Sequence, residues 1–416
     1  MAERMRDALE GPADNTWTGY SLAERDRRWA VVRANAAQAG FDCIFVPPYS
    51  DPMNLRTSPV VAWGNWADSR YLTQLPSAAV VLPTDGRPPI VVDGRGRGNH
   101  WVPDVRAASG SQRGSWAPAL VQALRDAGME RARIGVCGLK GGKVTHVRAP
   151  DGVVNYVSYA EVVRAFPNAT FEDATDVVGF ARYVKGDEEI ACLRRAAAIA
   201  EEGIDAMIEA AGPGADQAVV YTRAMARMME LGSEHYLLAF YAAPLGTQSQ
   251  RMTDPPIGRR LQRGDYITNE TSAVWGGQVS QEDQPILIGP IPDVYRQVIE
   301  LQREVWEEGL KLMKPGLTFG ELIDFVNGFG PRRGGRTMIT MHGRGIGDDN
   351  GPLITSRSVG ERVRDLAMEK GNVWVWKPSA ASADGRISFG WGGDVVVTET
   401  GGERLFKRPH GMVSVD

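Results

Sequence analysis

The chain has 416 residues, of which 43% are apolar and 24% are charged, values typical of a globular protein large enough for two domains. Its formal net charge of −4 argues against a nucleic-acid or membrane-surface protein, because both classes need a basic face. No apolar run approaches the length of a membrane span, and the N-terminal residues lack the apolar segment of a signal peptide.

The three cysteines, Cys43, Cys137 and Cys192, are widely spaced in apolar contexts. This spacing indicates reduced core thiols and offers no paired cysteines for zinc. We therefore expect a cytoplasmic protein that has no nucleic-acid or membrane partner.

The first half of the chain alternates helical and extended patterns. Residues 21–40 begin with a Ser-x-x-Glu capping box and keep a helical apolar spacing up to Gly40, which predicts a helix. Residues 117–129 predict another helix. Short apolar runs between turn residues predict strands at 41–48, 77–83, 88–94 and 132–138. This alternation favours an α/β domain over residues 1–180.

The second half, residues 181–416, predicts long helices and a set of strands. In chain order, these are helices at 185–212 and 216–233, strands at 264–289 around a hairpin turn at Gly276-Gly277, helices at 293–316 and 318–330, and strands at 371–379 and 392–405. The whole chain therefore predicts an α+β protein.

This order of elements, together with several short motifs, resembles the pita-bread superfamily, which contains methionine aminopeptidase, prolidase, aminopeptidase P and creatinase. The motifs are "DSRYLTQ" (68–74), "LQRGDYI" (261–267), "EVWEEGLKLMKPGLTFGEL" (304–322), "MHGRGIG" (341–347) and "VVVTETGGERL" (395–405). The resemblance implies an N-terminal creatinase-like α/β domain followed by a C-terminal pita-bread catalytic domain.

The peptidases of this superfamily hold two metal ions with two Asp, one His and two Glu. The residues at the five matching positions here are, in the same order, Glu270, Gln281, His342, Lys377 and Gly392. Two divalent ions need anionic ligands, whereas the ammonium of a lysine repels a cation. The comparison therefore implies a chain with no metal site and no cofactor.

Creatinase shares the fold, uses no metal, and cleaves a C–N bond of a small molecule by side-chain acid–base chemistry. It carries an active-site Glu just after the lost second Asp, where this chain has Asp283. Its catalytic His corresponds to Thr253, and another of its glutamates corresponds to Lys377. Creatine itself is therefore not the expected substrate.

His342 precedes glycines at 343, 345 and 347, and it has two interpretations. The near-neutral pKa of a histidine suits proton transfer, and the glycines allow a ligand to approach the backbone. Alternatively, the ring only fills a turn and bonds to a carbonyl. The pattern does not predict a dinucleotide site, since it lacks the strand–GxGxxG–helix setting and Asp348 and Asp349 would repel phosphate.

Glu270 and Asp283 should lie on adjacent strands and face the former metal cavity, whereas Glu282 should point away. The alternative is a pair of solvated strand carboxylates. Lys377 also has two interpretations. It either contributes to binding or catalysis, or it is an ammonium that replaces the lost cations and holds the carboxylates ionised.

Further side chains are candidates for substrate binding. Arg344 can bind a substrate carboxylate in a fork, or it can pair with Asp348 or Asp349. The other candidates are Gln281, Thr253, Tyr241, Trp376 and Trp391. Aromatic residues on strands usually belong to the core, which is the alternative for the two tryptophans.

In creatinase-like relatives the N-terminal domain reaches the site of the neighbouring subunit. The resemblance therefore implies a homodimer, in which Trp66 and Arg70 are candidates for such a contribution.

The leading hypothesis is a metal-independent enzyme acting on a small organic molecule. C–N hydrolysis would use His342 as general acid/base with Glu270 or Asp283 as its partner. Lys377 or Arg344 would stabilise negative charge or bind a substrate carboxylate. The alternatives are a lyase using proton abstraction, a non-catalytic binding protein, and a divergent Xaa-Pro-type metallopeptidase.

Overall fold

The computed structural model describes residues 19–48, 65–75, 78–94, 96–108, 115–140, 152–234, 236–247, 258–346, 351–355 and 361–416. These residues form two compact units, and the chain passes from one to the other between Tyr183 and Val184. Ile346 and Gly351 belong to the N-terminal unit. The division into domains 1–180 and 181–416, as independently folding parts, stays a prediction. Within the described residues, no helix is long and apolar enough to cross a membrane.

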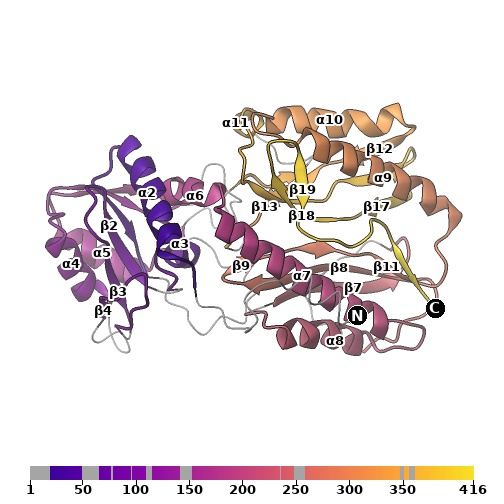
Figure 1. Ribbon diagram of the computed structural model, residues 1–416, viewed down its shortest axis with the longest axis horizontal. Coiled ribbons are helices and arrows are strands. Elements are labelled where there is room, and N and C mark those ends of the chain that lie inside the picture. The colour runs from indigo at the N-terminus through magenta and orange to yellow at the C-terminus, as the bar shows by residue number, and fades with distance from the viewer. Residues whose placement is uncertain are drawn as a thin grey trace. The chain divides into compact units, whose positions relative to one another are not determined.

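The N-terminal unit is a mixed six-stranded sheet with helices on both faces (Figure 1). Its strands lie in the order β4-β3-β2-β1-β5-β6. The strands are β1 (Cys43–Val46), β2 (Ala79–Pro83), β3 (Ile90–Asp93), β4 (Val105–Ala107), β5 (Arg133–Val136) and β6 (Thr170–Asp173), and the helices are α2 (Leu22–Gln38), α3 (Asn65–Thr73), α4 (Ala117–Asp126), α5 (Tyr156–Ala165) and α6 (Thr175–Tyr183).

Alternating side chains of the buried strands supply both cores of this sheet. In β1, Ile44 and Val46 pack with α2, α3 and α6, whereas Cys43 and Phe45 pack with α4 and α5. A strand that is apolar at every position is thus covered on both faces. Cys43, Cys137 and Cys192 are buried, and none of them forms a disulfide with another described residue.

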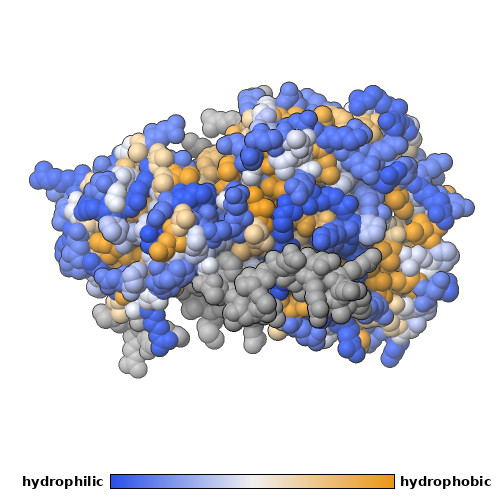
Figure 2. Space-filling view, in the orientation of Figure 1, coloured by the Kyte–Doolittle hydropathy of each residue, from blue (hydrophilic) through white to orange (hydrophobic). Residues whose placement is uncertain are grey.

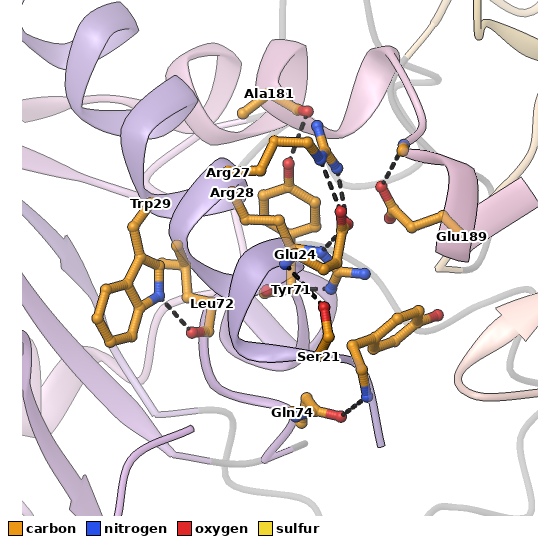
Figure 3. Close-up of polar contacts among 12 residues, drawn as sticks. Ser21, Glu24, Arg27, Arg28, Trp29, Tyr71, Leu72, Gln74, Ala181 and Glu189 are labelled. Atoms are coloured by element: carbon orange, nitrogen blue, oxygen red, sulfur yellow. Dashed lines mark hydrogen bonds and ion pairs between the residues drawn. The ribbon is translucent and has the colours of Figure 1, made fainter. Parts of the chain in front are cut away.

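A buried ion pair fixes α2 within the N-terminal unit (Figure 3). The Arg28 guanidinium is fully buried and donates to Glu24 Oε1 at 2.8 Å and to the Tyr71 carbonyl at 3.2 Å. Its carbon Cζ lies over the rings of Tyr20, Tyr71 and Trp101. Since a buried cation is costly unless it is paired, Glu24 is an essential partner.

The C-terminal unit contains an eleven-stranded sheet and a three-stranded sheet. Its helices are α7 (Asp187–Ala210), α8 (Gln217–Glu230), α9 (Asp293–Leu312), α10 (Phe319–Arg332) and α11 (Glu361–Arg364). The large sheet contains β7 (Tyr236–Pro244), β8 (Asp265–Trp275), β9 (Gln278–Val279), β10 (Glu282–Asp283), β11 (Ile286–Ile288), β13 (Thr340–Gly343), β14 (Ile354–Thr355), β15 (Val373–Trp376), β18 (Gly392–Val397), β19 (Gly402–Arg404) and β20 (Val413–Val415). The small sheet is formed by β12 (Gly335–Met338), β16 (Ser379–Ser382) and β17 (Ser388–Gly390).

The two long helix pairs of this unit pack on one face of the large sheet (Figure 1). Phe240 of β7 belongs to the core that α7 and α8 form with the sheet. Elsewhere in the sheet, Trp376 of β15 packs against Trp306 of α9. The indole N–H of each tryptophan donates to the backbone carbonyl of the other, both at 3.2 Å. Strand pairing places Phe240 and Trp376 on the same face, which leaves the opposite face to the polar residues described below.

Local sequence signals predict several of these elements correctly. The Ser21 hydroxyl caps α2 by accepting from the Glu24 amide at 3.2 Å. Gly276 and Gly277 both have positive φ values, 58° and 77°, and close the hairpin between β8 and β9. These values are those of a tight two-residue turn, in which glycine is favoured at both positions.

The described surface that is visible in one view is mainly polar. Figure 2 shows hydrophilic side chains over much of the viewed face, with apolar side chains gathered in smaller patches. The exposed large apolar residues include Val219 and Met229 of α8 and Val294 of α9. Scattered apolar side chains are ordinary on protein surfaces and do not by themselves mark an interface.

We expect Glu24→Gln to destabilise the N-terminal unit by about 3–5 kcal/mol, because it removes the carboxylate that contacts the buried Arg28 guanidinium at 2.8 Å. Urea denaturation of the full chain, followed by circular dichroism, measures the effect. The control is Glu172→Gln, which breaks an exposed pair with Arg133 and should change stability far less. Equal destabilisation by the two variants would contradict the role given to Glu24.

Candidate functional site

The predicted site residues come from neighbouring strands of the large sheet. Across the sheet, the strands follow the order β13-β15-β18-β10-β8, with β7 beside β8. Strand β13 carries His342, β10 carries Asp283, β8 carries Glu270, and Lys377 directly follows β15. Residues far apart in the sequence are therefore brought together by strand pairing.

The strand registers place these side chains on one face. His342 pairs with Val375, and Asp283 pairs with Gly392. Paired residues share a face and successive residues alternate. His342, Lys377, Asp283, Gln281 and Glu270 consequently all fall on the face opposite to the helices.

Glu282 falls on the helix-covered face, because it pairs with Gly393 and with Thr271. The pKa of its carboxyl is well above the ordinary value, first because burial disfavours the charged form and then because Glu201 of α7 lies near. The sheet thus separates Glu282 from Asp283, its immediate neighbour in the sequence.

An ammonium between two carboxylates forms the centre of the candidate site. Lys377 Nζ lies 2.5 Å from Glu270 Oε1 and 3.6 Å from Asp283 Oδ2. All three side chains are at least three-quarters buried. Because the surroundings are largely shielded from water, the electrostatic attraction within these ion pairs is much stronger than in an exposed pair.

Gln281 connects this centre to a second cation. Its side-chain oxygen accepts a hydrogen bond from the Arg344 guanidinium, and its Nε2 donates to Asp283 Oδ1 at 3.3 Å. Arg344 is fully buried. Its guanidinium therefore contacts a side chain of the protein, Gln281. Asp348 and Asp349, the other partners predicted for Arg344, lie outside the described residues.

Asp394 of β18 is a further acid on this face that the sequence interpretation missed. It pairs with Val375, which also pairs with His342, so the three side chains share a face. Asp394 Oδ2 accepts a hydrogen bond from the Gln281 amide at 2.9 Å. The signal that could have found it is the alternation along β18, since Asp394 stands two residues after Gly392.

Both buried aspartates hold protons more tightly than usual. Burial raises the pKa of Asp283 to about 6, and nearby Glu270 adds to this effect against the opposing attraction of Lys377. Burial likewise raises the pKa of Asp394 to about 7, against the attraction of Arg344. Burial acts to lower the pKa of Lys377, but the attraction of Asp283 and Glu270 outweighs it and raises that pKa. The site therefore contains carboxyl groups that exchange protons near neutral pH.

His342 is buried and its ring is oriented by the backbone. Its Nδ1 lies 3.1 Å from the carbonyl oxygen of Gly343. Because a carbonyl only accepts, this contact places a proton on Nδ1. The turn-filling contact considered from the sequence is thus present.

Helix α9 fixes the backbone on both sides of Lys377. Gln302 Nε2 donates to the carbonyls of Pro378, at 2.7 Å, and Trp391, at 2.9 Å. The amide of Lys377 donates to Thr340 O at 3.1 Å. His410, which had no evident role in the sequence, bonds to the side-chain oxygen of Gln302. These contacts explain how the lysine is held against the two carboxylates.

Two predicted binding residues lie on the other face of the sheet. Trp376 and Trp391 are buried almost completely, and their rings pack with α9. Their alternation with Lys377 and Gly392 turns them away from the polar cluster. The structure therefore places both tryptophans in the core, in contrast to the prediction that they line a substrate pocket.

The remaining candidates are placed as follows. Tyr241 is half-buried and pairs with Thr268, so its side chain falls on the face that carries Glu270. Arg70 belongs to α3 of the N-terminal unit. Thr253 and the side chain of Trp66 lie outside what the structure describes. Their roles in binding stay predictions.

The side chains at this centre do not fit the two-metal site of the superfamily's peptidases. Lys377 places an ammonium directly against Glu270. At Gly392, an added Cβ would lie 2.0 Å from the Trp376 carbonyl oxygen, so no acidic side chain fits there without movement. No group of three His, Cys, Asp or Glu in the described ranges is arranged to hold a metal ion.

Comparison with known proteins supports the resemblance. An uncharacterized hydrolase/peptidase of Sinorhizobium fredii is 27% identical over 263 residues, which cover 62% of this chain and 66% of the relative. Creatinase of a Bacillus species is 25% identical over 264 residues, which cover 60% of this chain and 64% of creatinase. The matched region thus spans less than two thirds of either relative.

Solved structures confirm the predicted fold. The X-Pro aminopeptidase of Thermotoga maritima superposes with a TM-score of 0.71 at 18% identity, covering 92% of this chain and all of that chain. The Xaa-Pro dipeptidase of Bacillus anthracis gives the same TM-score at 17% identity over 94% of this chain. The chain has the α+β pita-bread architecture of prolidase- and aminopeptidase P-like proteins. The sequence profile of metallopeptidase family M24 matches residues 191–399, half of the chain, and this protein belongs to that family.

Proposed function

We propose that this protein is a metal-independent hydrolase that cleaves a C–N bond in a small organic molecule. The observation that carries the proposal is the contact of Lys377 Nζ with both Glu270 and Asp283, on the face that also carries His342. The ammonium of Lys377 occupies the position beside these carboxylates that a metal ion would need. Proton transfer is the chemistry that remains available to such a set of side chains.

His342 Nε2 acts first as a base and then as an acid. It takes one proton from a water molecule while the water oxygen bonds to the substrate carbon. The C–N bond then breaks, and the imidazolium returns its proton to the leaving nitrogen. The products are a hydroxyl compound or acid and an amine, so no group other than water is consumed.

The charged side chains support this reaction by their position. Lys377 stabilises negative charge that develops on the substrate, and Glu270 and Asp283 hold the ammonium in place. Gln281 accepts a hydrogen bond from Arg344 and donates one to Asp283, so the position of Asp283 depends on that of Arg344. Tyr241, on the same face, is available for contact with the substrate. A lyase would use the same base without the water.

A non-catalytic binding protein is the second candidate, and one observation favours it. Lys377 forms ion pairs with both carboxylates, so the central charges balance one another without a substrate. Membership of a metallopeptidase family favours a third candidate, a divergent peptidase that recruits a metal. The following experiments separate these functions.

We expect the purified chain to contain no stoichiometric metal and to show no thermal shift with Mn²⁺, Co²⁺ or Zn²⁺, because Lys377 repels a cation at Glu270. Elemental analysis and thermal denaturation measure these properties, and a panel of small amides, guanidines and aromatic acids tests for a substrate. Stoichiometric metal, with stabilisation by the same ion, would return the protein to the metal-dependent peptidases.

We expect His342→Ala to lower turnover of a substrate from this panel by at least about 100-fold while the melting temperature changes little, since a general acid/base typically contributes that much. The control is His100→Ala, which removes a ring bonded to the Tyr20 carbonyl in the N-terminal unit. Retained activity in the His342 variant would exclude the proposed mechanism. Retained binding of a partner without any turnover would support the binding protein.

We expect Lys377→Met to destabilise the fold more at pH 8 than at pH 5. Asp283 has a pKa of about 6 in the fold against an ordinary 3.8, so its contribution to stability declines as pH rises from about 4 to about 6. Loss of the ammonium raises the pKa of Asp283 further, so the decline in stability continues to a higher pH than in the wild-type chain. Melting temperatures from pH 5 to 9 measure the difference. Lys311→Met, at an exposed pair with Glu308, should show no such trend.

A further inference from the structure

Strand β8 carries a row of partly exposed side chains that ends at the Lys377 centre. The odd-numbered residues from 265 to 269 are buried, whereas Tyr266, Thr268 and Glu270 are half-exposed. Because successive side chains of a strand point to opposite faces, these three share the face opposite to the helices. The four residue steps along this row span about 13 Å, enough for a small organic molecule to lie beside the strand.

Three hydroxyl groups lie along this row. Tyr241 of β7 pairs with Thr268 of β8, so their side chains are cross-strand neighbours, and Tyr266 is the next side chain on the diagonal. Within the described part of the chain, none of these three hydroxyls forms a hydrogen bond. A hydroxyl both donates and accepts, so each of the three can bind a polar group of a ligand. The carboxylates of Glu270 and Asp283, by contrast, are already paired with an ammonium.

Tyr266 keeps its proton at neutral pH. The pKa of its phenol is raised, first because burial disfavours the charged form and then because Tyr295 and Asp283 lie near. The effect of Asp283 places the phenol within electrostatic range of the ion pairs. Tyr266 therefore offers a hydroxyl donor together with an aromatic ring, and the face of such a ring attracts cationic and flat groups.

The charges at the end of the row select among ligands. Two carboxylates, Glu270 and Asp283, face the single ammonium of Lys377, so these three groups carry excess negative charge when both acids are ionised. Arg344, a further cation on this face, is fully buried and donates to Gln281. An anionic ligand would be repelled by the excess charge in surroundings largely shielded from water, whereas a neutral or cationic ligand would not.

We propose that Tyr241, Tyr266 and Thr268 form the substrate-binding strip of this site, and that the strip takes a flat amide or amidine in preference to an acid. This inference rests on the proposed hydrolase function and names its substrate class. The C–N group lies at the end of the strip that meets Glu270, and the remainder of the substrate lies against the two tyrosines. Tyr266 and Thr268, which no sequence motif singled out, are thus specificity-determining residues together with Tyr241.

The first test compares three probes, benzamidine, benzamide and benzoate, which share a flat ring and a similar size but are cationic, neutral and anionic. Calorimetric titration of the full chain at pH 8, where Asp283 is ionised, measures their dissociation constants. We expect benzamidine to bind at least about tenfold more tightly than benzoate, with benzamide between them. Binding of benzoate as tight as that of benzamidine would overturn the proposal, and so would an absence of binding by all three.

The second test removes the hydroxyls one at a time, in Tyr241→Phe, Tyr266→Phe and Thr268→Val. We expect each variant to weaken the binding of benzamidine about threefold to tenfold, the usual effect of one lost hydrogen bond. The melting temperature should change little, because none of these hydroxyls bonds to another described residue. The control is Tyr156→Phe, at an exposed position of α5 in the N-terminal unit, with binding within about twofold of wild type. Unchanged binding in all three strip variants would overturn the proposal.

Turnover separates this inference from the function on which it rests. For an amide or amidine that the wild-type chain hydrolyses, the three strip variants should raise KM and leave kcat within about threefold, since they remove contacts made equally in the bound and transition states. Hydrolysis that depends on His342 but on none of the three hydroxyls would overturn the strip alone. Binding of benzamidine that depends on the hydroxyls, without hydrolysis of any amide or amidine, would support the strip and overturn the hydrolase function.

Discussion

The ion pairs of Lys377 with Glu270 and Asp283 set the constraint on which the C-terminal site depends. A buried ammonium is stable only where carboxylates meet it, so strands β15, β10 and β8 must stay in register around Lys377. The backbone at Gly392 approaches the Trp376 carbonyl so closely that a side chain there would collide with it. The charge of Lys377 and the absence of a side chain at 392 are therefore parts of one arrangement.

The large sheet assigns packing to one face and polar chemistry to the other. Trp376 alternates with Lys377, and Glu282 alternates with Asp283, so each neighbour of a site residue is turned toward the helices. Helix α9 packs on the helix-covered face, where Gln302 donates hydrogen bonds to the carbonyls of Pro378 and Trp391. The position of the lysine thus depends on contacts made behind the sheet.

Elements with strong local signals could be predicted from the sequence, whereas those that depend on register could not. Helix α2 and the Gly276-Gly277 turn follow from capping and backbone chemistry alone. Strand β6 was missed because it is a partly exposed edge strand with one apolar residue, Phe171. The common face of Glu270 and Asp283 was anticipated from motif alignment. Asp394 was overlooked although it stands two residues after Gly392, and its relation to His342 follows from strand pairing.

The charges at the site explain why proton transfer is the chemistry to expect there. Among the described residues, two cations, Lys377 and Arg344, face three carboxylates, Glu270, Asp283 and Asp394, so this group of five carries excess negative charge when all are ionised. Burial makes that excess costly, and the pKa values of Asp283, about 6, and Asp394, about 7, rise accordingly. A metal ion would remove this excess, whereas fixed side chains leave it to be balanced by protons. A site whose charge is balanced by protons near neutral pH is suited to acid–base catalysis.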